Sequence, residues 1–173
     1  MTSSPEFARI ANRPDTSPDG LLSAFYIEVE AWDEAEAFGR RLRELVGAGV
    51  KAGLEADFEA ETLSEADVPA WAAEAWAEAA PRYAAHRGDE EWTVQDLLYS
   101  FDPSQRTWSW WDVTLVAGNI VCMWIDSKEE AVYGCEELRW MTYAAGARSL
   151  VGPLLKEKGE WEQSASLANE VSP

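Results

Sequence analysis

The fold of this 173-residue chain is indicated most strongly by residues 108–126, which read WSWWDVTLVAGNIVCMWID. Two runs rich in β-branched and aromatic residues flank Gly118-Asn119, a pair typical of a two-residue hairpin turn of the primed type. We therefore expect antiparallel strands at Trp108–Val116 and Ile120–Asp126. Trp110 and Trp111 are consecutive, so on a strand their side chains must point to opposite faces of the sheet.

Alternating patterns predict three more strands. Ala24–Trp32 alternates apolar and polar residues, and Trp92–Phe101 leads through the Asp102-Pro103-Ser104 turn into the hairpin. Residues 54–61 alternate apolar side chains with four carboxylates, which favours a strand with one charged face. An Ala/Glu helix is the alternative for residues 54–62.

Three helices are expected between these strands. An Asp33–Glu36 capping box should open the first, and Gly47 and Gly49 should end it. The second is predicted from about Asp67 to Ala85 on its high alanine content. A Ser127–Glu130 box should start the third, which runs toward Val151 until Gly152-Pro153 stops it.

The order β-α-β-α-β-β-β-α predicts a single-domain α+β fold, in which about three helices pack mainly on one face of a mixed or antiparallel sheet of about five strands. The domain is expected at residues 21–158. The proline-rich residues 1–20 are predicted to form a flexible N-terminal arm, and residues 159–173 a flexible C-terminal tail.

The net charge of the chain limits which classes of partner it can bind. The 32 acidic and 14 basic residues give a net charge of −18, whereas a magnitude of about 2–8 suffices for the solubility of a small domain. Direct binding to nucleic acid or to an anionic membrane is disfavoured, because both depend on Lys and Arg. With no apolar run near the roughly 18 residues of a membrane span and no signal peptide, we expect a cytoplasmic protein.

The acidic residues are concentrated between Lys51 and Arg82, where no Lys or Arg occurs. Trp71 and Trp76 lie among them, and tryptophan is a residue type that supplies binding hot spots, although either ring could instead belong to the core. A solvated acidic surface is the alternative for the charges. The residues predicted to bind a partner are Glu55, Asp57, Glu59, Glu61, Glu65, Asp67, Trp71 and Trp76.

Signatures of catalysis and of metal binding are absent from the sequence. His86 is the single histidine and is expected in a polar turn, and no GxSxG or phosphate-binding loop occurs. Cys122 and Cys135 form no CxxC pair, and Thr62 occupies the position where an EF-hand loop requires glycine. We therefore expect no catalytic residue, no metal and no cofactor, leaving open a carboxylate pair among Asp112, Asp126 and Glu136.

Together these features favour an acidic protein that binds and neutralises a basic protein, such as the immunity protein of a nuclease-type bacterial toxin. One alternative is a small-molecule-binding protein or an unrecognised enzyme with a pocket lined by Trp110, Trp111 and Trp124. Another is a structural or assembly component, which would self-associate even at high salt.

Overall fold

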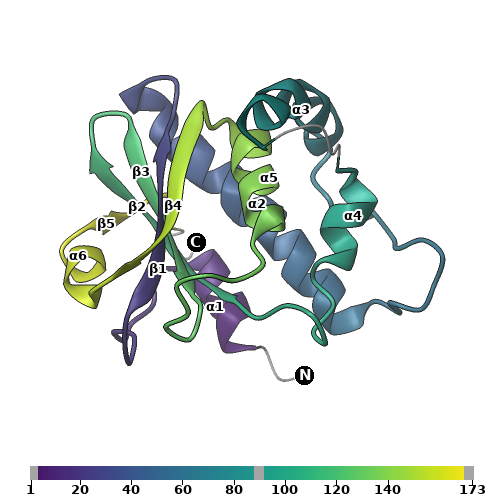
Figure 1. The fold of residues 1–173 in the computed structure, drawn as a ribbon, viewed down its shortest axis with the longest axis horizontal. Helices are drawn as coiled ribbons and strands as arrows, with labels where there is room; N and C mark the ends of the chain where they lie inside the picture. Colours follow the sequence, from purple (N-terminus) through teal and green to yellow (C-terminus); the bar gives the residue numbers. More distant parts are fainter. Residues whose placement is uncertain (1–3, 88–91, 170–173) are drawn as a thin grey trace.

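A computed structural model, which describes residues 4–87 and 92–169, has an α+β fold built on one five-stranded antiparallel sheet (Figure 1). The strands lie side by side in the order β4-β1-β3-β2-β5, and every pairing is antiparallel. Their bounds are β1 (Leu22–Glu28), β2 (Ser109–Ala117), β3 (Ile120–Asp126), β4 (Ser149–Lys156) and β5 (Ala165–Ser166). The predicted fold class is therefore confirmed.

The helices lie mainly on one side of this sheet. Figure 1 shows α2 and α5 against the sheet, α3 and α4 farther out on the same side, and α6 on the opposite side. The helical elements are α1 (Pro5–Ala11), the 3-10 turn η1 (Trp32–Glu34), α2 (Ala35–Glu55), α3 (Ala72–Arg87), α4 (Val94–Tyr99), α5 (Glu136–Ala145) and α6 (Lys158–Glu162).

The predicted hairpin is present. Ala117 pairs with Ile120, and Gly118 has a φ of 56°, which glycine adopts without strain. The hairpin also separates the two tryptophans as predicted, because Trp110 joins the large core beneath the helices while Trp111 joins a smaller cluster on the other face. That smaller cluster contains Leu22, Ala24, Trp111, Cys122, Trp124 and Trp161.

The prediction of a strand at residues 54–61 is wrong. Helix α2 continues to Glu55, and a loop without regular structure follows it. Local contacts explain the loop. The Asp57 carboxylate accepts a hydrogen bond from the Glu59 N–H, and the Phe58 ring packs edge-on against the Tyr99 ring, with 6.4 Å between the ring centroids. The alternating pattern therefore belongs to an exposed loop that contacts α4 through the Phe58 ring.

The predicted end of the first helix at its glycines is also wrong. Gly47 and Gly49 lie inside α2, and a Cβ on Gly49 would stand 2.3 Å from a ring carbon of Phe101. Glycine is present here because it lets that ring approach the helix. The helix starts after η1 with Glu34 as its cap, and no side-chain hydrogen bond of the expected Asp33–Glu36 box forms there.

Residues 92–101 contain helix α4 where a strand was expected. Thr93 and Asp96 form a reciprocal capping box, with the Thr93 hydroxyl accepting from the Asp96 N–H at 3.1 Å and the Asp96 carboxylate accepting from the Thr93 N–H at 2.7 Å. This box satisfies backbone donors at the helix start and so favours the helix over a strand.

The expected long helix from Ser127 to Val151 is replaced by a loop, the shorter helix α5 and strand β4. Lys128 and Glu129 adopt positive φ angles of 55° and 64°, which a right-handed helix cannot accommodate. The Gly152-Pro153 pair lies within β4, where a Cβ on Gly152 would stand 2.6 Å from the Ala24 carbonyl oxygen of β1. Glycine thus permits close pairing of the strands instead of ending a helix.

Both predicted flexible ends contain structure. Helix α1 lies within residues 1–20 and buries Glu6 and Ile10. Most of α6 and all of β5 lie within residues 159–173, where Trp161 and Leu167 are buried. The described part of each end is thus packed against the domain.

Candidate functional site

Six carboxylates lie within residues 55–67, at the end of α2 and in the loop that follows it, and we call this stretch the acidic segment. All six of its carboxylates are exposed. They belong to Glu55, Asp57, Glu59, Glu61, Glu65 and Asp67. The structure therefore brings the six acidic residues of the predicted site together on one continuous loop.

Helix α4 holds this loop in place. The Gln95 side chain accepts a hydrogen bond from the Leu63 N–H and donates one to the Leu63 carbonyl oxygen, each at 2.9 Å. Leu63 itself is buried, and the Tyr99 hydroxyl donates to the Ala60 carbonyl oxygen. The carboxylates are thus displayed from a backbone that is fixed at several points.

Few cations face the acidic segment. Lys51 lies 2.8 Å from Asp67, and this hydrogen bond raises the pKa of the lysine. Glu65 accepts a hydrogen bond from Gln95, which is neutral. The other four carboxylates belong to Glu55, Asp57, Glu59 and Glu61, and they form no ion pair with any Lys or Arg whose side chain is described (residues 4–83 and 92–169).

The two tryptophans predicted for this site differ in position. Trp71 is half-buried, and its indole N–H donates to the Glu44 carboxylate at 2.7 Å. Trp76 is only 6% exposed, stacks on Trp140 at 5.3 Å between ring centroids, and donates to the Trp92 carbonyl oxygen. Trp76 is therefore a core residue, since its burial leaves almost no surface for a partner.

Two of the three tryptophans named for the alternative pocket, Trp110 and Trp124, are fully buried. Trp124 donates to the Thr114 hydroxyl at 2.9 Å, and Trp110 donates to the Arg9 carbonyl oxygen at 3.3 Å. Trp111, the third, lines a cavity. The two buried rings serve packing instead.

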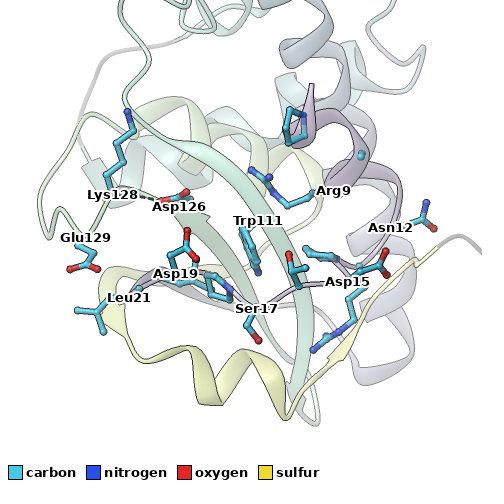
Figure 2. Close-up of a pocket in the computed structure, with 18 of the residues that line it drawn as sticks. Arg9, Asn12, Asp15, Ser17, Asp19, Leu21, Trp111, Asp126, Lys128 and Glu129 are labelled. Atoms are coloured by element: carbon cyan, nitrogen blue, oxygen red, sulfur yellow. Dashed lines mark hydrogen bonds between the residues drawn. The ribbon is translucent and has the colours of Figure 1, made fainter. Parts of the chain in front are cut away.

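That cavity, which we call the Trp111 groove, has a volume of about 1210 Å³ and lies on the face of the sheet opposite α2 and α5 (Figure 2). Its walls come from α1, from the chain between Asn12 and Leu22, and from the loop that follows β3. Figure 2 shows Trp111 in the middle of the labelled residues, between Arg9 and Ser17. The guanidinium of Arg9 stacks over the Trp111 ring at 4.9 Å from its centroid.

A buried carboxylate, Asp112, was not singled out as a structural centre by sequence reasoning. Its oxygens accept hydrogen bonds from Arg43 at 2.7 Å, from the Trp161 indole at 2.8 Å and from the Ser166 hydroxyl. Burial lowers the pKa of Arg43, and Asp112 partly offsets this effect. Because its oxygens already accept these bonds, Asp112 ties α2, α6 and β5 to the sheet and is poorly placed to act on a substrate.

The other two carboxylates considered for catalysis belong to Asp126 and Glu136. Asp126, at the end of β3, lines the Trp111 groove. Glu136, at the start of α5, accepts a hydrogen bond from the Tyr83 hydroxyl, and burial raises its pKa. Its neighbour Glu137 accepts from the Trp108 indole, and burial raises its pKa as well. The first bond joins α3 to α5, and the second joins α5 to Trp108, the residue directly before β2.

Among the side chains that the structure describes, those of residues 4–83 and 92–169, no three from His, Cys, Asp or Glu are grouped to hold a metal ion. Cys122 and Cys135 are both buried and are not joined in a disulfide, and Arg139 donates a hydrogen bond to the Cys135 sulfur at 3.2 Å. His86 falls within α3, where only its backbone is described. Among the helices of the described chain, none combines the length and the apolar character needed to cross a bilayer.

Comparisons of the chain with models of protein families, with curated proteins and with solved structures gave no match. The function must therefore be inferred from the surfaces of the chain itself.

Proposed function

We propose that this chain binds and neutralises a basic protein through the acidic segment, in the manner of an immunity protein that blocks a nuclease-type bacterial toxin. The observation that carries the proposal is the exposed run Glu55, Asp57, Glu59 and Glu61, whose carboxylates form no ion pair with a described Lys or Arg side chain. The proposal assigns the chain no catalysis, no contact with nucleic acid and a place in the cytoplasm.

Electrostatics supports a cationic partner. Like charges that are held close together repel one another, and a positively charged surface placed against them would relieve this repulsion. Complementary patches also steer association and raise its rate by roughly 10–1000-fold at low salt. A nuclease is a suitable target, because a site that grips phosphates must itself be cationic.

The fixed backbone of the acidic segment adds to this argument. Binding by a loop that has to become ordered loses part of its energy to that ordering. The Gln95 bonds to Leu63 already hold the segment against α4. Half-buried Trp71 lies close by in sequence and offers an aromatic side chain of the kind that anchors interfaces.

A charge-reversal experiment tests the proposal. The variant carries Glu55→Lys, Asp57→Lys, Glu59→Lys and Glu61→Lys, which takes the net charge from −18 to −18 + 8 = −10. Wild type and variant are immobilised and exposed at low salt to a lysate of the native host. We expect a basic protein to bind wild type, to elute with salt and to be lost from the variant.

A control variant has the same net charge but leaves the acidic segment intact. It carries lysine at four exposed acidic positions elsewhere: Asp33, Glu34, Glu130 and Glu157. The control should retain the basic partner. Equal loss from both variants would mean that only total charge matters, and equal retention by both would refute the proposal. A self-associated protein that persists at high salt would instead indicate an assembly component.

A further inference from the structure

The floor of the Trp111 groove contains a hydrogen-bond donor without an acceptor. Trp111 is only 8% exposed, and its indole nitrogen is buried with no hydrogen-bond partner. By contrast, Trp124 and Trp161, which belong to the same cluster, donate to Thr114 and Asp112. A buried N–H without a partner destabilises the protein, so an acceptor supplied from the groove would be favoured there.

The walls of the groove carry more negative than positive charge. Its cations are Arg9, Arg13 and Lys128, and its carboxylates are those of Asp15, Asp19, Asp126 and Glu129. Arg13 is turned away from a ligand, because it donates to the Trp161 and Ser164 carbonyl oxygens and lies 3.6 Å from Asp112. Asp15 and Asp19 are exposed and accept no hydrogen bond within the described chain.

The size of the groove indicates the size of the ligand. Its volume of about 1210 Å³ exceeds the roughly 300–1,000 Å³ typical of small-molecule pockets. One wall is the irregular chain between Asn12 and Leu22, and the floor is an aromatic ring on the sheet (Figure 2). A chain-like ligand that lies along the groove suits this shape better than a compact one.

We propose that the Trp111 groove binds an extended peptide segment that carries basic side chains. A backbone carbonyl of the peptide accepts the Trp111 indole N–H, and a lysine or arginine of the peptide lies between Asp15 and Asp19. Because the indole nitrogen is closed to solvent, the part of the groove wall that covers it must move for the carbonyl to reach it. This site is separate from the acidic segment and does not depend on the function proposed for it.

NMR spectroscopy of the indole N–H groups tests the proposal on the intact chain. The probe is a capped peptide, acetyl-Gly-Lys-Gly-Lys-Gly-amide, and the control peptide has glutamine in place of both lysines. The resonance of Trp111 is identified as the one lost in Trp111→Phe. We expect the lysine peptide to shift this resonance saturably and more than the other nine tryptophan resonances, at concentrations up to about 1 mM.

Matched variants decide whether the charges matter. The double variant Asp15→Asn, Asp19→Asn alters exposed side chains that make no hydrogen bond within the described chain. It should lower the affinity for the lysine peptide about two- to twentyfold. Asp57→Asn with Glu59→Gln alters the acidic segment and should leave peptide affinity unchanged. The proposal is overturned if the Trp111 resonance does not shift, if the glutamine peptide binds equally well, or if the Asp15 and Asp19 changes have no effect.

Discussion

Replacing Asp112 by asparagine should be among the most damaging single changes in this protein. Asparagine keeps the shape of the side chain but removes the charge that balances Arg43, whose guanidinium lies 2.7 Å away and is itself buried. Breaking one partner of a buried ion pair costs about 3–5 kcal/mol. For a domain of this size about 1 kcal/mol lowers Tm by roughly 2–4 °C, so Tm should fall by about 6–20 °C.

Urea titration followed by tryptophan fluorescence measures the loss, and Asp67→Asn is the matched control. The same substitution at Asp67 breaks an ion pair with Lys51 in which both side chains are well exposed, so little change is expected. If Asp112→Asn moves the urea midpoint no further than Asp67→Asn does, Asp112 is not the structural centre that its contacts indicate. Hydrogen exchange gives a second readout, because the Leu167 N–H bond to the Val113 carbonyl oxygen joins the C-terminal segment to β2 beside Asp112.

Two further predictions concern α2 and α5. Gly49→Ala should destabilise the fold by about 1–3 kcal/mol, because the new Cβ would stand 2.3 Å from the Phe101 ring. Gly47→Ala, whose Cβ would meet only Ile10 at 3.4 Å, should stabilise the helix by about 0.5–1 kcal/mol, and equal effects in urea titrations would contradict the proposed role of Gly49. Burial of Glu137 raises its folded pKa above the unfolded value of about 4.3, so this group favours folding at low pH and costs stability as pH rises through that window. The Tm of Glu137→Gln minus that of wild type should therefore increase with pH between about pH 4 and the raised pKa of Glu137. A Tm difference that does not change with pH would show that burial does not raise the pKa of Glu137.

Local sequence signals predicted the centre of the sheet correctly. The hairpin depends on Gly118-Asn119 and on two adjacent runs, so all of its information lies within 19 residues. Strand β4 pairs instead with β1, which lies more than a hundred residues earlier. Its residues Leu150 and Val151 were therefore assigned to the end of a helix, because the partner that makes them a strand is not visible locally.

The error at residues 54–61 has a different cause. Alternation of apolar and charged side chains describes any segment with one face against the protein, and a strand additionally needs a neighbour with free backbone groups. The sheet ends at β4 and β5, and Phe58 meets Tyr99 of α4 instead. The four carboxylates of this stretch are exposed, which is the ordinary state of Asp and Glu, but Leu54, which the alternation placed on the core face, is exposed as well.

The buried charges were beyond local reasoning. Asp112 meets Arg43 across 69 positions, and Glu6 meets Arg106 across 100 positions. Nothing near Asp112 in the sequence identifies its partner. Only the unusual placement of an aspartate between Trp111 and Val113, within an otherwise apolar strand, could have marked it as a candidate for burial.

These internal partnerships make the surface more negative than composition alone implies. Several arginines point inward: Arg43 and Arg106 pair with the buried carboxylates of Asp112 and Glu6, while Arg41 donates to the Ala145 carbonyl oxygen. Arginine suits this use because one guanidinium offers five donors. An arginine that binds a neutral carbonyl oxygen in this way neutralises no carboxylate. Fewer cations therefore remain near the exposed acidic side chains. The negative field around the acidic segment is thus a consequence of how the core is held together.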